Sequence, residues 1–384
     1  MTPAARTQAA IELLDAIIVA AEQGGAAADT LIARYFSQRR YAGSKDRRAV
    51  RELVYAAIRL LGERPADGRA AMIALARTDP AVDATFDGSA HGPLPIADEP
   101  GAAPGLHPRW LIDRLAASGV DAAEQAALVD RAPLDVRFNI LQSRSVDVPG
   151  ALAISGLPDA LRLPAGTDLT PLAGIVEPQD AGSQAVTLAA QVQPGMTVLD
   201  LCAGAGGKTL ALAAAMHNEG RILATDTDRT RLSRLAPRAQ KAGVGIVETR
   251  LLDPGKEREQ LAGVMADVVL IDAPCSGTGT WRRNPEARWR LTPARLDRFA
   301  DVQRHVLALG AACVRPGGAL VYITCSLLDA EGSAPVDAFL AEHAGWMAEQ
   351  LTLPFGRPRG AGLRLTPAHD GTDGFFVARL RAPC

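Results

Sequence analysis

The chain has 384 residues, with 41 Lys and Arg against 43 Asp and Glu, and a formal net charge of -2. This length predicts two or three domains, because a single hydrophobic core rarely organises more than about 300 residues. Hydrophobic residues make up 48% of the sequence and charged residues 22%, a composition that excludes wholesale disorder and a collagen-like chain. Because the net charge is close to zero, any contact with nucleic acid depends on a local basic patch.

Five cysteines lie in the second half of the chain without dense spacing, which predicts reduced thiols. The six histidines are far apart in the sequence and no Cys-x-x-Cys occurs, so we predict no metal site. The apolar stretch Ala9–Ala21 is interrupted by Glu12 and Asp15 and is too short to span a bilayer. We therefore expect a cytoplasmic protein that does not associate with membranes.

Residues 1–80 carry apolar residues at three- and four-residue spacing, which predicts a small helical bundle. Residues 34–59 hold eight basic residues against two acidic ones, with aromatic residues interleaved. Two interpretations are open at this point: a solvated helix face, or a surface that binds phosphate groups.

The middle of the chain predicts a connection and a small module. Residues 81–108 are rich in Pro and Gly without a sustained period, which is typical of a linker or long loop. Residues 109–180 predict two helices, at Trp110–Ala117 and Ala122–Val129, and a strand at Val136–Leu141. We interpret this region as an α+β connecting module.

From residue 181 to residue 384, apolar runs alternate with amphipathic helical segments. This alternation predicts a doubly wound, mostly parallel α/β sheet of the Rossmann type, whose ligand binds at the carboxyl ends of the strands. The predicted strands are Met196–Leu201, Arg221–Thr225, Val244–Val247, Val268–Ile271 and Leu320–Thr324, and the predicted helices are Gly207–Met216, Arg229–Lys241 and Leu296–Cys313.

The first of these strands leads into a glycine-rich loop, Cys202-Ala203-Gly204-Ala205-Gly206-Gly207-Lys208. Its glycines allow the backbone to approach a ligand at the start of a helix. The end of the loop imitates a nucleotide triphosphate-binding loop, but Cys202 stands where that motif requires Gly. Asp226 follows about twenty residues later, where an acidic residue commonly binds ribose hydroxyls. A nucleoside-containing cofactor is predicted, and NAD remains open on these two features alone.

Two cysteines follow neighbouring strands at the same predicted edge. Asp272-Ala273-Pro274-Cys275 ends one strand, and Thr324-Cys325-Ser326 ends the next. A single cysteine after a strand is usually a small core residue, but two at neighbouring strand ends, one of them beside a carboxylate, favour a catalytic pair.

These residues resemble the RNA 5-methylcytosine methyltransferases of the RsmB/Sun type. The resemblance covers most of the chain, from the basic helical start, which is similar to that family's NusB-like RNA-binding domain, to the closing Gly371-Thr372-Asp373-Gly374-Phe375-Phe376. It implies that Cys325 is the nucleophile and that Cys275 assists release of the product. Asp272 is a further catalytic candidate, which could hydrogen-bond the cytosine ring or serve only to position the cofactor.

The same resemblance implies S-adenosylmethionine as the cofactor. It assigns to the cofactor site Cys202, Ala203, Gly204, Ala205, Gly206, Gly207, Lys208, Asp226, Asp253 and Asp272. The sequence departs from the family pattern at Ala203-Gly204-Ala205, at Gly332 after Glu331, and before Asp253, where the usual glycine is absent. The implied function is methylation of carbon 5 of a cytosine in 16S ribosomal RNA, and hence a part in rRNA processing, by a protein expected to be monomeric.

The target base must leave its stack to reach a thiol, so the resemblance implies single-stranded or locally opened RNA. Candidate RNA contacts come from the N-terminal basic run and from the segment 281–290, where tryptophans could stack on bases. They are Arg39, Arg40, Arg47, Arg48, Arg282, Arg283 and Arg288. Three alternatives remain open: a tRNA cytosine-5 methyltransferase, a non-catalytic RNA-binding ribosome assembly factor, and a DNA cytosine methyltransferase, against which Thr324-Cys325-Ser326 argues.

Overall fold

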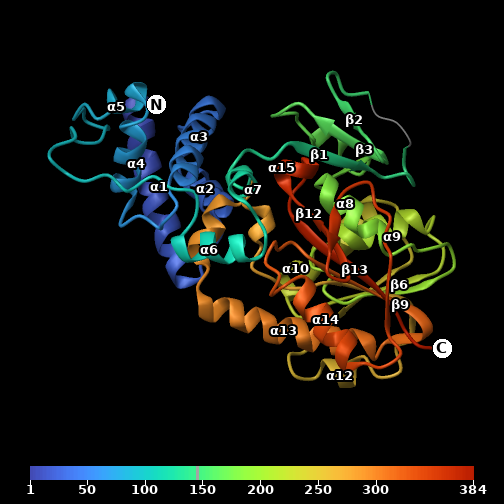
Figure 1. Ribbon diagram of the computed structural model, residues 1–384. Coiled ribbons are helices and arrows are strands. Elements are labelled where there is room, and N and C mark those ends of the chain that lie inside the picture. Colours follow the sequence, from blue (N-terminus) through green and yellow to red (C-terminus); the bar gives the residue numbers. More distant parts are fainter. Residues whose placement is uncertain (144–146) are drawn as a thin grey trace. The chain divides into compact units, whose positions relative to one another are not determined.

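The computed structural model describes residues 1–143 and 147–384, and it divides into two compact units (Figure 1). Unit 1 comprises Met1–Arg131 and Thr280–Thr292, and unit 2 comprises Ala132–Gly279 and Pro293–Cys384. This division differs from the predicted boundaries at residues 80, 108 and 180. The predicted linker lies within unit 1 because its backbone bonds to the helices there, for example from Gly105 N–H to the Leu60 carbonyl at 2.9 Å.

Unit 1 is helical, as the spacing of its apolar residues predicts. Its helices are α1 (Pro3–Gln23), α2 (Ala28–Ser37), α3 (Ser44–Leu60), α4 (Gly68–Ala76), α5 (Pro80–Asp83), α6 (Arg109–Ala117) and α7 (Ala122–Ala127), with the 3₁₀ helix η3 (Pro285–Arg290). Thr2 begins α1, because its hydroxyl accepts a hydrogen bond from Ala5 N–H and Pro3 occupies the first turn. The core between α1, α3 and α4 buries residues such as Leu14, Val54 and Met72.

Unit 2 contains a small antiparallel sheet and a large mixed sheet. The small sheet has the order β2-β3-β1-β4, from β1 (Leu134–Phe138), β2 (Leu152–Ile154), β3 (Leu157–Leu163) and β4 (Val176–Pro178). The large sheet has the order β11-β12-β13-β9-β8-β5-β6-β7, and β10 also pairs with β13. Its strands are β5 (Thr197–Asp200), β6 (Arg221–Asp226), β7 (Val247–Leu251), β8 (Ala266–Asp272), β9 (Val314–Thr324), β10 (Met347–Glu349), β11 (Arg357–Arg359), β12 (Gly362–Leu365) and β13 (Phe375–Arg381).

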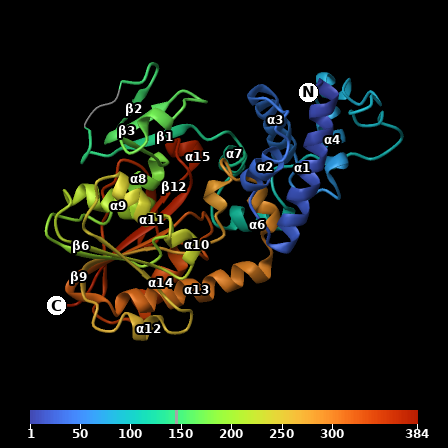
Figure 2. The same cartoon turned by 180° about the vertical axis from the view of Figure 1, so that it is seen from behind.

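Helices cover both faces of the large sheet, which confirms the predicted doubly wound α/β fold (Figures 1 and 2). One face carries α8 (Ala181–Leu188), α9 (Gly207–Ala215) and α11 (Leu235–Lys241), and the other carries α12 (Glu257–Gln260), α13 (Pro293–Ala311) and α14 (Ser333–Glu342). Along β8, Val268 and Leu270 pack with the α8 and α9 side, whereas Val269 and Ile271 pack with the α13 and α14 side. A strand buried on both faces therefore appears as a continuous apolar run.

Several predicted elements have different bounds in the structure, such as β1, which ends at Phe138 where the prediction ends at Leu141, and two elements differ more. The third strand of the prediction ends at residue 247, but β7 begins there and runs to Leu251, with Glu248 and Thr249 exposed. β7 is the edge strand of the sheet, so it lacks the apolar run that marks the buried strands. The helix predicted over 229–241 is two short helices, α10 (Arg229–Leu232) and α11.

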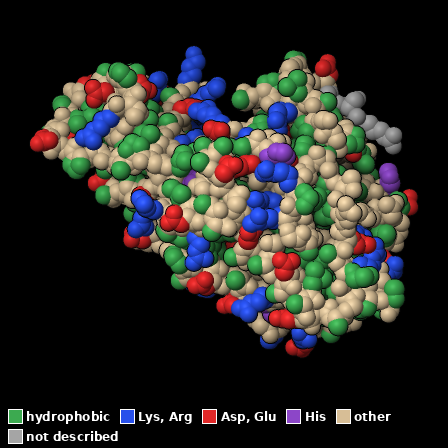
Figure 3. Space-filling view, in the orientation of Figure 1, with side chains coloured by type: hydrophobic (Ala, Val, Ile, Leu, Met, Phe, Trp, Pro, Cys, Tyr) green, Lys and Arg blue, Asp and Glu red, His purple; other side chains and the backbone are tan. Residues whose placement is uncertain are grey.

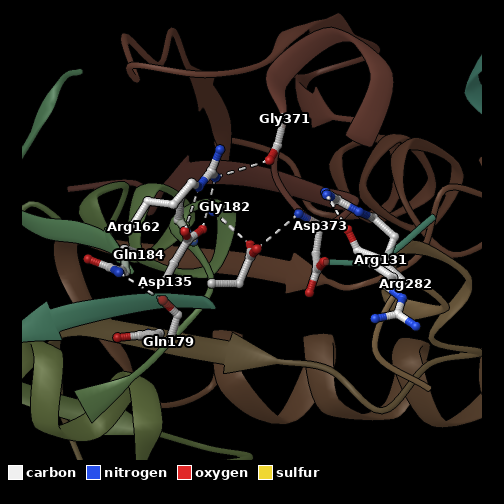
Figure 4. A network of polar contacts seen from close by, with 11 residues as sticks. Arg131, Asp135, Arg162, Gln179, Gly182, Gln184, Arg282, Gly371 and Asp373 are labelled. Atoms are coloured by element: carbon white, nitrogen blue, oxygen red, sulfur yellow. Dashed lines mark hydrogen bonds and ion pairs between the residues drawn. The ribbon is translucent and has the colours of Figure 1, made fainter. Parts of the chain in front are cut away.

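A polar network joins the small sheet to the segment before β13 (Figure 4). Asp135 on β1 is 2% exposed and accepts two hydrogen bonds from Arg162 on β3, at 2.8 and 3.1 Å. Arg162 also donates to the carbonyl of Gly371, which follows α15 (Pro367–Asp370), and Asp180 accepts from Asp373 N–H at 3.1 Å. These bonds satisfy buried charges and thereby fix the small sheet against the large one within unit 2. In the described parts of the chain, no helix has the length and apolar character needed to cross a membrane.

Candidate active site

The glycine-rich loop follows β5 and leads into α9, as predicted. Gly206 has a φ of 85°, and a Cβ there would lie 2.1 Å from Cδ1 of Leu235, so only glycine fits without rearrangement. Asp226, at the end of the neighbouring strand β6, accepts hydrogen bonds from the N–H groups of Gly204 and Asp228, each at 2.8 Å. The loop and Asp226 therefore share one edge of the sheet.

A cavity of about 530 Å³ opens at this edge. Its wall includes Cys202, Asp226, Arg231, Asp272, Cys275 and Cys325, so both predicted thiols and three of the predicted cofactor residues face one space. The cavity has the size of typical small-molecule sites. Asp253 is exposed instead, and its carboxylate accepts a hydrogen bond from the Gln260 amide at 3.1 Å.

The two predicted catalytic thiols are in contact. Sγ of Cys275 and Sγ of Cys325 lie 3.4 Å apart, because β8 and β9 are parallel neighbours with Asp272 paired to Ile323. Each cysteine follows its strand by one to three residues, so the register of the strands brings the two loops together. The hydrogen bond with Cys325 and burial raise the pKa of the Cys275 thiol well above its ordinary value. These interactions therefore favour the protonated form of Cys275.

Lys208 lies beside the thiols with its charge paired. Nζ of Lys208 is 2.6 Å from Oδ2 of Asp272, and it also lies 5.7 Å from the centre of the Phe375 ring. Burial opposes the charge on Lys208, but the Asp272 carboxylate outweighs burial and raises the lysine pKa. The site thus holds a charged lysine that is paired with a carboxylate and interacts electrostatically with Cys325.

Asp200, the last residue of β5, is a fully buried carboxyl below the glycine loop. Oδ2 of Asp200 accepts a hydrogen bond from Oγ1 of Thr209 at 2.6 Å. Burial raises the pKa of Asp200 to about 7, with contributions from the charges of Asp272 and Asp226. Above about pH 7 the Asp200 carboxylate is therefore a buried negative charge close to Asp272 and Asp226.

Asp200→Asn is expected to remove a pH dependence of stability. Since folding raises the pKa of Asp200 to about 7 from its ordinary value of 3.8, the native state binds more protons than the unfolded state between these values. The stabilising contribution of protonated Asp200 to the free energy of unfolding is therefore fully present below about pH 4, and it is lost as pH rises to about 7. In chemical denaturation, the free energy of unfolding of the wild type should fall by about 2 kcal/mol more between pH 5 and pH 8 than that of the variant. Parallel losses in the two proteins would contradict the assignment.

The comparisons with known proteins agree with this geometry. A family model described as 16S rRNA methyltransferase RsmB/F matches residues 186–381, just over half of the chain. The chain belongs to this RsmB/F methyltransferase family.

Two curated relatives are similar over most of the chain. The probable ribosomal RNA small subunit methyltransferase B of Synechocystis is 38% identical over 65% of this chain and 60% of its own length. The ribosomal RNA small subunit methyltransferase B of Sodalis glossinidius is 34% identical over 72% of this chain and 65% of its own length. The chain thus matches less than two thirds of either relative. The crystal structure of PH0851 shares the fold, with a TM-score of 0.77, 24% identity and coverage of 99% of both chains.

S-adenosylmethionine is the cofactor of this methyltransferase family, and the residues present fit it. The glycine loop begins at Cys202, which lines the cavity, and Asp226, which is 8% exposed, lines it as well. These are the features expected for a nucleoside with ribose hydroxyls. Asp226 and the loop from Cys202 to Lys208 would hold the nucleoside end, and Asp272 borders the thiols.

The segment 281–290 does not have the role that the sequence predicts. Trp281 is 0% exposed and its ring lies 4.7 Å from the ring of His107, and Trp289 donates a hydrogen bond to the Gly62 carbonyl. Arg288 is also 0% exposed and donates to the carbonyls of Ile58 and Leu61 at 2.6 and 2.7 Å. The predicted stacking on bases and the predicted phosphate contact of Arg288 are therefore wrong. These side chains instead complete the core of unit 1.

The remaining candidate RNA contacts lie in different surroundings. In the space-filling view, Lys and Arg side chains gather where α3 lies (Figure 3), and Arg40 and Arg48 are exposed. Arg39 stacks on the Tyr35 ring at 3.6 Å, and Arg47 donates to the Ala42 carbonyl. Arg282 and Arg283 are half-buried in unit 1, where Arg282 donates to the Arg131 carbonyl at 3.3 Å. Arg40 and Arg48 are thus the strongest remaining candidates for phosphate contacts.

Arg288→Ala and Arg48→Ala are expected to have opposite effects. Loss of Arg288 leaves buried carbonyls without donors and should lower the free energy of unfolding by about 3 kcal/mol. Loss of Arg48, which is exposed, should leave stability unchanged and weaken RNA binding, with a smaller salt dependence. Thermal denaturation measures the stability of the two variants, and filter binding across salt concentrations measures their affinity for RNA. A stable Arg288→Ala protein with weakened RNA binding would restore the sequence interpretation.

Sequence reasoning missed two groups at the site. Arg231 lines the cavity, and a Cβ on Gly204 would lie 2.5 Å from its Nη2. Its position in a helix after β6 matches no motif. Glu331 is 1% exposed and contacts the residues that follow both thiols. Its place six residues after Cys325, in a segment without other acidic residues except Asp329, was the available signal.

Proposed function

We propose that the protein transfers a methyl group from S-adenosylmethionine to carbon 5 of a cytosine in 16S ribosomal RNA. The observation that carries the proposal is the pair of thiols 3.4 Å apart in the cavity that also includes Asp226 and Asp272. The family and the names of its relatives support an RNA substrate from the small ribosomal subunit.

The chemistry follows from the cytosine ring. Carbon 5 is a poor nucleophile until the ring loses its conjugation, which a thiolate achieves by adding to carbon 6. Cys325 attacks carbon 6, with Lys208 supplying the positive charge that favours its thiolate. S-adenosylmethionine supplies the electrophilic methyl group. After a base removes the carbon 5 proton, the bond between Cys325 and carbon 6 breaks, and Cys275 assists that release.

Asp272 has two functions in this proposal. Its carboxylate holds Lys208 at 2.6 Å, and its remaining oxygen can accept a hydrogen bond from the exocyclic amine of cytosine. A uracil offers a carbonyl oxygen at that position and would be disfavoured. The proposed specificity for cytosine therefore rests on an acceptor at the end of β8.

The test uses the purified chain with radiolabelled S-adenosylmethionine and, in separate reactions, transcribed 16S rRNA and transcribed tRNA. Bisulfite sequencing then maps 5-methylcytosine. One protected cytosine in the 16S rRNA is the expected result. Label in tRNA alone would overturn the target, and cofactor binding without transfer to either RNA would favour an assembly factor.

A further inference from the structure

A single buried carboxylate contacts the loops that carry the two thiols. Glu331 is 1% exposed, in the turn between β9 and α14. Its Oε1 accepts from Ser276 N–H at 2.8 Å and from the Gln303 amide at 3.2 Å. Its Oε2 accepts from the hydroxyl of Ser326 at 2.6 Å and from the hydroxyl of Ser276. Four donors therefore converge on the two oxygens of one side chain.

The sequence positions of two of these donors connect Glu331 to both thiols. Ser276 directly follows Cys275, and Ser326 directly follows Cys325. The Ser276 and Ser326 hydroxyls also lie 3.2 Å apart. One carboxylate is thus hydrogen-bonded to the residue next to each thiol.

Glu331 is itself fixed to the end of β9. Its backbone carbonyl accepts from the hydroxyls of Tyr322 at 2.8 Å and Thr324 at 3.3 Å. Gln303 on α13 donates both to Glu331 and to the carbonyl of Pro274, at 3.0 Å for the second bond. The carboxylate therefore has little freedom to follow either loop, and each loop must conform to it.

We propose that Glu331 is the positioning residue of the two-thiol site, holding the loops after β8 and β9 so that the Cys275 and Cys325 sulfurs face each other. This inference rests on the proposed function, in which one thiol adds to the base and the other assists its release. A carboxylate suits the role because it is an acceptor only and its two oxygens can take all four donors, whereas an amide oxygen takes two. Hydrogen bonds to an ionised group are also shorter and stronger than neutral ones.

The first test measures the proximity of the thiols without RNA or cofactor. Diamide removes two electrons and two protons from a pair of thiols, so a sulfur–sulfur bond forms as diamide is reduced to the hydrazine. Mass spectrometry of the digested protein quantifies the Cys275–Cys325 disulfide over time. Glu331→Ala should slow its formation by about tenfold, since the loops lose their shared charged acceptor.

Matched variants separate positioning from a general loss of stability. Glu286→Ala removes another glutamate that is 1% exposed, whose carboxylate in unit 1 accepts from Ala28 N–H at 3.0 Å, and it should leave the disulfide rate unchanged. Ser276→Ala and Ser326→Ala should each slow the reaction less than Glu331→Ala. Adding either serine substitution to Glu331→Ala should have little further effect, because the three residues act as one network. If Glu331→Ala does not fold, the serine variants and Glu331→Gln decide the result.

The second test measures single-turnover methyl transfer and RNA affinity. Glu331→Ala should lower the rate of transfer by at least tenfold and leave the Kd for RNA unchanged, with Glu331→Gln between it and the wild type. A folded Glu331→Ala protein that forms the disulfide at the wild-type rate would overturn the inference, as would an equal slowing by Glu286→Ala. If the disulfide rates respond as expected but the wild type transfers no methyl group, the proposed function fails and the structural role of Glu331 stands.

Discussion

Cys325→Ala is expected to abolish methyl transfer and covalent attachment to RNA, whereas Cys275→Ala is expected to leave the protein covalently attached to its RNA. Without the thiolate, carbon 5 of cytosine has no activated form, and the rate should fall by about 10⁴-fold or more. Without Cys275, addition and methylation should proceed but release of the product should be slow. Denaturing gels that detect an RNA–protein adduct, together with bisulfite sequencing, distinguish the two variants.

Cys313→Ser provides the control for these substitutions. Cys313 is 3% exposed in the core beside α13, outside the cavity wall that contains the two thiols, so its loss should alter stability more than the yield of adduct. If Cys275→Ala abolished attachment while Cys325→Ala retained it, the assignment of the nucleophile would be reversed. The short distance between the sulfurs makes this experiment necessary, because geometry alone places both thiols at the cavity.

The sheet and the contents of its edge were largely predictable from the sequence. Strands such as β8 are buried on both faces, and their apolar runs therefore stand out against the helical segments. The glycine loop, Asp226 and the two cysteines all follow such strands, and the carboxyl ends of parallel strands share one edge. For these residues, order along the chain was enough to predict proximity in space.

The segment 281–290 was not predictable in the same way. Its arginines and tryptophans match the composition of an RNA-binding loop, yet Arg288 and Trp289 bond to backbone carbonyls of residues more than 200 positions earlier. Arg288 is buried because the carbonyls that accept its hydrogen bonds lie at the end of a helix that is distant in the sequence. The residues around Arg288 do not indicate where that helix ends. The role of Glu331 was not predicted for the same reason, because its hydrogen-bond donors come from two strand ends and from α13.

Lys208→Met is expected to lower the rate of methyl transfer by about 10²- to 10³-fold, the effect typical of removing one preorganised charged group from an active site. Lys208 is nearly buried and its charge is matched by Asp272 at 2.6 Å, so the methionine variant removes the positive charge while it keeps most of the side-chain volume. The loss should appear in the rate of adduct formation, because in the proposed mechanism Lys208 supplies positive charge beside the attacking Cys325. Single-turnover rates between pH 6.5 and 9 measure this.

The pH profile tests which step the lysine serves. If Lys208 serves the attack by the thiol, the variant should recover part of its rate as pH rises, because a larger fraction of any thiol is thiolate at higher pH. Asp272→Asn is the matched comparison: it removes the carboxylate that offsets the burial of Lys208, so it should lose rate with a different profile and weaken discrimination against uracil. A Lys208→Met deficit that is constant across pH would instead assign the lysine to holding Asp272 or the cofactor. In the proposed mechanism the ion pair between Lys208 and Asp272 connects the two halves of the site, since one partner serves the thiol and the other serves the base.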